Sequence, residues 1–489
     1  MTIFGRFDGG LLSGGKEIDK MLKFRSIRAV IAVLLFSKIL ASYVWFGLVT
    51  YRRTPKGIRR EKMDALHSRN AQRLYADFVR LKGVYIKIGQ FLSTQAAFLP
   101  TQYLMEMVKM QDQMPTASEK EVRQRIIEQY GKPAEEVFAK FDPVPLACAS
   151  IGQVHRVTLQ DGREAVIKVK YPGIDKFFFA DIKVVRLMLP IFVKILEWGF
   201  YRESSGIEFS VLIDEFTTHI HLELDYRNEA RNQIRMYEQL KGLRDRRMVV
   251  VPRLYEEYCR DAILCMEFIQ ARKIVPWYSD PQVPTDKKNW IFRCLVECLF
   301  FTISYYGFFQ ADTHPGNFMV LDETPGSSGS TATLVMLDFG CTKDFPEGFR
   351  TDVVRVVNGY LTRQHDQITD ALWNQGFRTR LQTRESFDLW VRQGIRITDE
   401  ILGFFRDGTS LIDLLRNNLS EMTAEFVALN DEHRIVSVPH HYALLARVLA
   451  TAPVPLELHM PKVDFLPIAI TYLSVLSSKA TTEQRATTA

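Results

Sequence analysis

Two short runs in the second half of the chain carry the acidic and amide side chains that phosphoryl-transfer sites use. Asp312 and Asn317 stand five residues apart in Asp-Thr-His-Pro-Gly-Asn, and Asp338 begins Asp-Phe-Gly directly after an apolar run. In such sites an aspartate accepts the proton of the attacking hydroxyl, while an asparagine and a second aspartate bind Mg²⁺. We therefore predict Asp312 as a catalytic residue and Asn317 and Asp338 as magnesium ligands.

A run of small residues and a lysine precede these acids in the order that a nucleotide site requires. Residues 147–154 read Ala-Cys-Ala-Ser-Ile-Gly-Gln-Val and match the loop G-x-G-x-x-G-x-V, with alanine in place of the first two glycines. Lys168 follows Val154 by fourteen residues on a second apolar run. We predict Lys168 as catalytic, and we predict a nucleotide-binding set of Ala147, Ala149, Ser150, Gly152, Val154 and Lys168.

Each run is weak by itself, because a small-residue turn, an edge lysine or a Pro-Gly turn would explain it. Their order along the chain favours a nucleotide site. Two features depart from protein kinases: Gln310 and Ala311 stand where an arginine would precede Asp312, and no A-P-E run follows Asp338. Helical periodicity returns from about Phe349, which leaves little room for a peptide-binding segment. We do not expect an ordinary protein substrate.

The elements that would position these residues follow from the spacing of apolar side chains. Helical periodicity covers residues 57–130 and most of the chain after residue 272. Strand-like runs lie at 154–159, 165–169, 248–251, 262–266, 318–321 and 334–337, and Asp161-Gly162 between the first two is a strong hairpin signal. We predict an α+β chain with a bilobal protein-kinase-like fold, a helical N-terminal extension and an N-terminal membrane-associated helix.

The predicted domain organisation has five segments. They are an N-terminal segment with the apolar helix (1–55), the helical extension (56–143), a β-rich kinase-like N-lobe with a helical insertion (144–270), an α-rich kinase-like C-lobe (271–480) and a tail (481–489).

The apolar stretch at residues 29–50 is long enough to cross the roughly 30 Å hydrocarbon core of a bilayer. Lys38 lies near its middle, and the cost of burying that charge makes crossing only marginally favourable. A helix lying in the membrane interface and a buried core helix are the alternatives. Basic residues flank the stretch on both sides, so the positive-inside rule gives no orientation. We expect membrane association, with the kinase-like domain on the cytoplasmic or matrix-like side.

Composition excludes other classes of protein. The 489 residues are 47% hydrophobic and 25% charged with a formal net charge of +6, which is ordinary for a globular protein and lacks the basic runs of a nucleic-acid tail. The six cysteines are scattered, so we expect reduced thiols and neither a disulfide scaffold nor a zinc site. No nucleic-acid partner is expected.

The combination of motifs resembles the UbiB/AarF-type atypical kinases, which include the coenzyme Q-associated ADCK-type proteins. The resemblance covers about residues 80 to 345. The motifs that carry it are Lys87-Ile-Gly-Gln90, Ala147-Cys-Ala-Ser-Ile-Gly-Gln-Val-His155, Glu223-Leu-Asp-Tyr-Arg-Asn-Glu229, Asp312-Thr-His-Pro-Gly-Asn317 and Asp338-Phe-Gly340.

The resemblance implies a regulatory role for the helical extension. Lys87, Gly89 and Gln90 would form a K-x-G-Q motif that folds over the active-site cleft. Glu223 and Asp225 would form the E-x-D element that faces this extension.

The resemblance also implies that Glu229 pairs with Lys168, which adds it to the nucleotide-binding set. Glu267, directly after the predicted strand 262–266, completes that set. By residue type alone, Glu223 and Glu229 would be read as the solvated face of a charged helix.

The function implied by the resemblance is that of an atypical kinase or ATPase that binds ATP or ADP with Mg²⁺ and supports ubiquinone or other prenyl-lipid metabolism. The expected partners are a membrane lipid or prenyl-quinone precursor, together with lipid-biosynthesis proteins. One alternative is a nucleotide-gated lipid-binding scaffold, a pseudokinase with little or no phosphoryl transfer. A relative of the antibiotic and choline kinases would share the spacing of Asp312 and Asn317 but gives no role to Lys87-Ile-Gly-Gln90.

Overall fold

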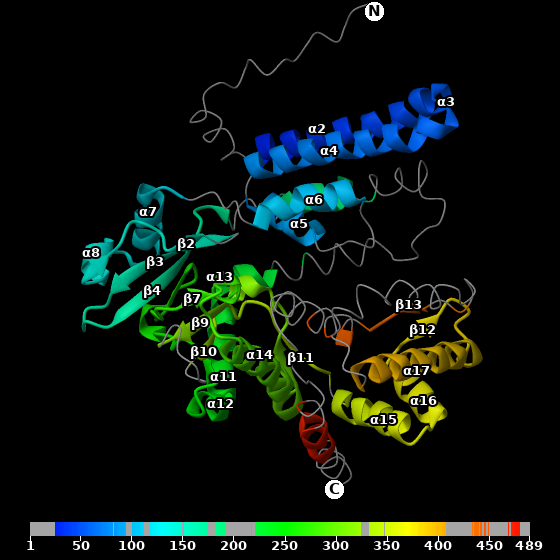
Figure 1. Ribbon diagram of the computed structural model, residues 1–489. Coiled ribbons are helices and arrows are strands. Elements are labelled where there is room, and N and C mark those ends of the chain that lie inside the picture. The colour runs from blue at the N-terminus through cyan, green and yellow to red at the C-terminus, as the bar shows by residue number, and fades with distance from the viewer. Residues whose placement is uncertain are drawn as a thin grey trace, which may run out of the picture. The chain divides into compact units, whose positions relative to one another are not determined.

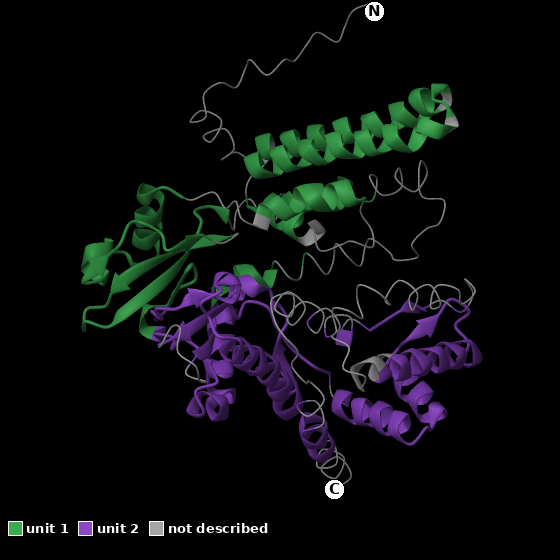
Figure 2. Cartoon of the chain, viewed as in Figure 1, with its two compact units in different colours: residues 1–226, 257–265 green, residues 227–256, 266–489 purple. Residues whose placement is uncertain are grey.

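The computed structural model describes residues 25–81, 83–93, 100–111, 117–148, 151–174, 181–188, 190, 217, 221–323, 332–346, 348–406, 433, 435–439, 441–442, 445, 448, 468 and 471–479. The chain divides into two compact units, coloured separately in Figure 2. Unit 1 comprises residues 1–226 and 257–265, and unit 2 comprises residues 227–256 and 266–489. Each unit is described by itself.

Unit 1 begins with a helical layer whose longest members, α2 and α4, run side by side (Figure 1). The helices are α2 (Arg25–Trp45), α3 (Tyr51–Arg53), α4 (Arg59–Leu81), α5 (Val84–Ser93) and α6 (Thr101–Val108), with a π-helical turn at Phe46–Thr50 and 3₁₀ turns at Lys56–Ile58 and Lys109–Gln111. Both α5 and α6 pack against α4. The prediction of a helical extension is confirmed.

Helical periodicity alone does not show where α4 ends. Gly83 adopts a φ of 58°, in the left-handed region, between the last residue of α4 and the first residue of α5. A left-handed residue stops an α-helix because its carbonyl no longer points along the axis, and glycine adopts this conformation without the Cβ clash. The break starts a separate helix for the K-x-G-Q motif.

The predicted membrane-associated segment forms one nearly continuous helix. Residues Ile27–Thr50 form a stretch of 24 residues that is long and apolar enough to cross a membrane, with a mean hydropathy of 2.0 over an 18-residue window. One third of that window (33%) is buried inside the protein. Lys38 is exposed.

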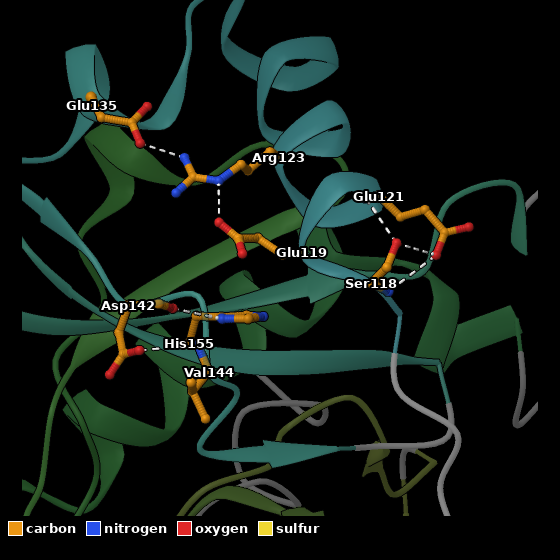
Figure 3. Close-up of polar contacts among 8 residues, drawn as sticks. All are labelled: Ser118, Glu119, Glu121, Arg123, Glu135, Asp142, Val144 and His155. Atoms are coloured by element: carbon orange, nitrogen blue, oxygen red, sulfur yellow. Dashed lines mark hydrogen bonds and ion pairs between the residues drawn. The ribbon is translucent and has the colours of Figure 1, made fainter.

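A capping box fixes the start of α7 (Glu119–Tyr130), which precedes α8 (Ala134–Val137). The side chain of Ser118 accepts a hydrogen bond from the backbone of Glu121, and the Glu121 carboxylate accepts one from the Ser118 backbone (Figure 3). Arg123 on the next turn binds the carboxylates of Glu119 and Glu135 (Figure 3). These contacts join α7 to α8.

The sheet of unit 1 has five strands in the order β1-β3-β4-β6, with β2 paired to β3. The strands are β1 (Lys140–Phe141), β2 (Ala147–Cys148), β3 (Gly152–Thr158), β4 (Glu164–Lys170) and β6 (Ile263–Glu267). The β3–β4 hairpin turns at Asp161-Gly162, where Gly162 has a φ of 85°. The strands predicted at 154–159, 165–169 and 262–266 are therefore confirmed.

Unit 2 contains a second, four-stranded sheet in the order β5-β10-β9-β7, a two-stranded sheet of β8 and β11, and a further pair of β12 and β13. The strands are β5 (Val249–Val250), β7 (Arg272–Lys273), β8 (Phe308–Gln310), β9 (Phe318–Asp322), β10 (Ala332–Met336), β11 (Thr342–Asp344), β12 (Arg378–Thr379) and β13 (Ile435–Ser437). The helices are α11 (Tyr226–Gln239), α12 (Lys241–Asp245), α13 (Ile274–Ser279), α14 (Thr285–Tyr306), α15 (Phe349–Leu361), α16 (His365–Asn374) and α17 (Arg384–Arg406), with a 3₁₀ turn at Pro315–Asn317. The first residue of α11, Tyr226, and the last two of a further 3₁₀ turn at Glu256–Tyr258 are counted in unit 1.

A buried ion pair attaches α14 to this sheet. Lys287 Nζ lies 2.7 Å from Asp322 Oδ1, and the two side chains are 0% and 1% exposed. The indole of Trp277 donates a hydrogen bond to the other carboxylate oxygen of Asp322. Because a buried charge without partners is costly, these contacts fix the end of β9, the strand that directly follows Asn317.

The C-terminal helical residues 471–479 pack on α14. The ring of Tyr472 stacks on Phe300, and its hydroxyl lies 3.4 Å from Glu297 Oε2. Ile468 and Tyr472 thus belong to the hydrophobic core of unit 2.

Candidate active site

The side chains of Asp312 and Asn317 are in direct contact in unit 2. Asn317 Nδ2 donates hydrogen bonds to the Asp312 carboxylate (3.2 Å to Oδ2) and to the Asp312 carbonyl (3.0 Å). The 3₁₀ turn Pro315–Asn317 folds the chain back between them, and His314 Nδ1 accepts from the Gly316 backbone to hold that turn. The amide of Asn317 therefore fixes the position of the Asp312 carboxylate.

The backbone next to Asp338 is hydrogen-bonded to the same turn. Leu337 N donates to Asn317 O at 3.0 Å, and Ala311 N donates to Cys341 O at 2.8 Å. The Asp338 carboxylate accepts from Gly340 N at 2.9 Å. The segments containing Asp312, Asn317 and Asp338 are thus brought together by backbone hydrogen bonds, as their order in the sequence predicts.

Two neutral side chains support this arrangement. Gln310 Nε2 donates to Asp338 O, and Asn232 Nδ2 on α11 donates to Phe339 O at 3.0 Å. Phe339 is fully buried. In the sequence Gln310 is only a departure from the protein-kinase pattern, whereas in the structure it helps to hold the D-F-G segment.

The donor set suits a magnesium ion that is held partly by a nucleotide. Mg²⁺ prefers oxygen ligands and is usually bound through one or two protein carboxylates together with substrate phosphates. Asp338 offers carboxylate oxygens and Asn317 an amide oxygen, and both are half-buried. Among the described residues there is no cluster of three or more His, Cys, Asp or Glu side chains that would hold a metal without phosphate.

In unit 1, Lys168 lies on β4 opposite Val154 of β3. It is largely buried, with its Nζ 5.3 Å from the ring centroid of Tyr226, and Lys170 Nζ lies 4.9 Å from the same ring. An aromatic face attracts a cation that has lost part of its hydration. Tyr226 thus supports both lysines, a role that sequence analysis missed although the residue lies between Asp225 and Glu229.

Gly152 of the small-residue loop leaves no room for a side chain. A Cβ added there would lie 2.4 Å from Val169 O and 2.8 Å from the hydroxyl of Tyr226. Ala147 pairs with Val154 across β2 and β3. Ala149 and Ser150 lie outside the described residues, so their predicted role in nucleotide binding stays a prediction.

The two predicted glutamates of the nucleotide set lie in unit 2. Glu229 is buried on the first turn of α11, and Glu267 Oε2 accepts a hydrogen bond from Arg253 N at 3.2 Å. The pairing of Glu229 with Lys168 joins residues of different units and stays a prediction.

The K-x-G-Q motif lies on α5. Lys87 Nζ is 2.5 Å from Glu223 Oε1, and Gln90 Nε2 donates to Met110 O at 3.2 Å. Gly89 faces the buried Met110, whose Sδ would lie 2.1 Å from an added Cβ. Asp225 is exposed. Within unit 1 the motif therefore contacts the E-x-D element through Glu223.

His155, the last residue of the loop motif, is a neutral structural residue. Its Nδ1 lies 2.9 Å from Asp142 O (Figure 3), and its Nε2 lies 2.8 Å from Gln153 Nε2. Burial lowers the pKa of the imidazole, and the nearby Asp142 carbonyl offsets this only in part. A tautomer with Nδ1 protonated satisfies both contacts.

All six cysteines are free thiols. Burial raises the pKa of Cys265, Cys294 and Cys298, so these three groups are protonated near neutral pH. They lack the thiolate character of metal ligands.

The fold and these contacts define an α+β kinase-like protein. The chain matches the ABC1 atypical kinase-like domain over residues 109–372, which is more than half of its 489 residues. It belongs to this family.

Three curated relatives illustrate the range of the family. Protein ACTIVITY OF BC1 COMPLEX KINASE 8, chloroplastic, of Arabidopsis thaliana is 31% identical over 65% of this chain and 40% of its own length. AarF domain-containing protein kinase 1 of Gallus gallus is 31% identical over 71% of this chain and 64% of its own. An uncharacterized Synechocystis protein is 29% identical over 65% and 51%. The chain thus spans less than two thirds of the length of these curated relatives.

A solved structure has the same fold. The complex of Rv3197 with erythromycin from Mycobacterium tuberculosis superposes with a TM-score of 0.51 at 26% identity, and it covers 81% of this chain and 94% of that one.

Proposed function

We propose that this protein binds a magnesium nucleotide and transfers or hydrolyses its terminal phosphate. The observation that carries the proposal is the contact of Asn317 with Asp312, next to the backbone bond from Leu337 that brings Asp338 to the same turn. When bound, Mg²⁺ would neutralise charge that develops on the phosphates. Asp338 and Asn317 would hold it, Asp312 would orient the attacking hydroxyl or water, and Lys168 would orient the phosphates.

The acceptor that we favour is water or a small hydroxyl compound, and the pathway is ubiquinone or other prenyl-lipid metabolism at a membrane. The absence of an A-P-E run after Asp338 supports an acceptor other than a peptide. Relatives named for the bc1 complex and for AarF support the pathway. We place the kinase-like domain on the cytoplasmic or matrix-like side, with lipid-biosynthesis proteins as further partners.

Nucleotide binding is tested by thermal shift with Mg-ATP and Mg-ADP. Asp338→Asn should abolish the magnesium-dependent shift, because it removes the anionic ligand. Asp344→Asn is a matched control, since this exposed carboxylate on β11 binds Arg235. An undiminished shift in Asp338→Asn would refute the assignment of the site.

The second candidate is a nucleotide-gated lipid-binding scaffold with little turnover. The alanines at 147 and 149 favour it, because each adds a methyl group and stiffens a loop that glycine would let close on the phosphates. Phosphate release with and without anionic liposomes separates the two functions. Release that Asp312→Asn abolishes supports the enzyme, whereas nucleotide binding without release supports the scaffold. Quinone and prenyl-lipid profiles of cells lacking the protein test the pathway.

A further inference from the structure

Helix α2 and the π-helical turn Phe46–Thr50 that continues it have two apolar faces that differ in their surroundings. The inner face is buried at helical spacing, through Ala32, Leu35, Phe36, Ile39, Tyr43 and Phe46. The outer face is exposed, through Val30, Val33, Leu34, Trp45 and Leu48, and Trp45 is 65% accessible. A helix that is only part of a protein core would have polar side chains on its outer face.

Polar contacts on the inner side attach α2 to the rest of unit 1. Tyr43 OH lies 2.7 Å from His67 Nδ1 on α4 and 2.8 Å from Tyr103 OH on α6. Ser42 Oγ accepts a hydrogen bond from Asn70 Nδ2 at 2.8 Å. If α2 left α4 to cross a bilayer, these groups would lose their partners in hydrocarbon, where each unsatisfied polar group costs several kcal/mol.

An ion pair ties down the beginning of the same helix. Arg28 Nη2 lies 2.5 Å from Asp181 Oδ2, and Arg28 Nη1 donates to Leu81 O at 2.6 Å. Both charged side chains are buried, at 8% and 2% exposure. Separating them would leave a buried carboxylate without its cation, which opposes any movement of α2 away from unit 1.

The charged groups near the outer face are mostly basic. Arg53 at the end of α3 and Arg60 and Lys62 on the first turn of α4 are exposed cations. Lys38 on α2 and Arg69 and Arg73 further along α4 are also exposed, and Glu61 is the exposed acid among the described side chains of residues 25–81. Arg73 Nη1 binds Asn70, the residue that holds Ser42, so it lies beside α2. A basic border around an apolar strip matches an anionic membrane surface.

Aromatic residues lie at the C-terminal end of α2, close in sequence to the cations Arg53, Arg60 and Lys62. Trp45 is exposed, and Tyr51 stands one and a half turns further on with the guanidinium of Arg59 4.4 Å above its ring. Tryptophan and tyrosine favour the region of the lipid headgroups, because each combines an apolar ring with a polar group.

We propose that the outer face of α2 binds the surface of an anionic phospholipid bilayer while its inner face stays docked on α4 and α6, so that the helix lies in the interface and does not cross. This inference rests on the membrane part of the proposed function and is independent of the nucleotide site. Lys38 on the exposed side would then reach the headgroups, which removes the conflict of a lysine in the middle of a spanning helix.

Flotation of the full chain with vesicles tests the surface. Binding to vesicles of phosphatidylcholine with phosphatidylglycerol should exceed binding to phosphatidylcholine alone, and Leu34→Glu/Leu48→Glu should weaken it at least about tenfold. Leu361→Glu/Leu389→Glu is the matched control, because both leucines are exposed on unit 2. Equal flotation of the two double variants would overturn the proposal. The proposal would also be overturned if the wild-type chain did not bind vesicles and instead formed a dimer through this face.

A disulfide between α2 and α4 tests whether the helix stays docked. Ser42→Cys/Asn70→Cys replaces two side chains that are in contact, and mass spectrometry reports the oxidation state. The oxidised protein should float with anionic vesicles as well as the reduced protein and the Ser42→Cys single variant do. If the double variant lost vesicle binding only when oxidised, α2 would have to leave unit 1 in order to bind. That result would overturn the proposal that the docked helix lies in the interface. The Mg-ATP thermal shift of each variant shows separately whether the nucleotide site is intact.

Discussion

Lys87 Nζ lies 2.5 Å from Glu223 Oε1, which joins the K-x-G-Q helix α5 to the segment directly before α11. The two side chains are 19% and 12% exposed, so the pair is partly shielded from solvent. A partly buried pair depends on both of its members, because removal of one leaves the other charge in a poorly hydrated place.

Lys87→Met should destabilise unit 1 by about 1–3 kcal/mol, because Glu223 would lose the ammonium group that lies 2.5 Å from it. The double variant Lys87→Met/Glu223→Gln should regain part of that loss. Urea unfolding of the wild type, both single variants and the double variant gives the coupling free energy. Strict additivity of the two substitutions would contradict a direct interaction.

Gly89→Ala should destabilise the protein by about 1–3 kcal/mol through overpacking, because the new methyl group would meet Met110 Sδ. Shortening the partner should relieve the clash, so Gly89→Ala/Met110→Ala should be less destabilised than the sum of its single variants. Gly57→Ala is the control, since no atom lies within 4 Å of its added Cβ. Thermal unfolding of the four variants measures these differences. An effect of Gly89→Ala no larger than that of Gly57→Ala would argue against the close approach.

Arg28→Met should be among the most destabilising single changes in unit 1, by about 3–5 kcal/mol, because it leaves the buried Asp181 carboxylate without its cation. Arg163→Met, which breaks an ion pair with Asp161 between exposed side chains, should cost far less because solvent screens the two charges. Comparing urea midpoints of the two variants checks the contrast. Comparable losses in both would mean that the Arg28 contact does not anchor α2.

Stability should fall as the pH drops below about 6.5, in part through His155. Its pKa in the folded protein is lowered by burial, while the unfolded chain binds a proton near the ordinary value of 6.5. Over the interval between these two pKa values only the unfolded state is protonated, so each pH unit removes up to about 1.4 kcal/mol. The pKa of His67 is lowered by burial in the same way and adds a decrease of the same sign.

The variant that isolates this effect is His155→Gln, which should flatten the decrease below pH 6.5 without removing the part due to His67. Chemical unfolding at a series of pH values gives the slopes. Parallel curves for the wild type and His155→Gln would show that His155 is protonated equally in both states.

Much of the site in unit 2 could be predicted because its residues are close in sequence. Asp312 and Asn317 are separated by a single turn, and one hairpin connects Asn317 to Asp338. Short loops between paired strands leave few ways to arrange such residues. The same reasoning accounts for the β3–β4 hairpin, where the local signal at Asp161-Gly162 agrees with the strand register.

The residues that support the site were harder to find because their partners are distant. Tyr226 lies against Gly152 and beneath Lys168, and Gln153 binds the backbone of Ala117. Such contacts are set by how helices and strands meet, and no local pattern records them. Gly83, which separates α4 from α5, differs from these residues because a glycine inside a long helical pattern can mark the end of a helix. The sequence alone could therefore have indicated that break.

Residue type and spacing along the chain were sufficient to predict the kinase-like class of the fold, the order of the candidate-site motifs and a long apolar helix near the N-terminus. Tertiary structure decided which face of α2 is buried. Arg28 and Asp181 lie 153 residues apart in sequence yet form a bidentate ion pair. Both faces of that helix are apolar, so hydropathy does not distinguish them. Packing against α4 and α6 does, because it buries the inner face and holds it by hydrogen bonds while the outer apolar face stays exposed.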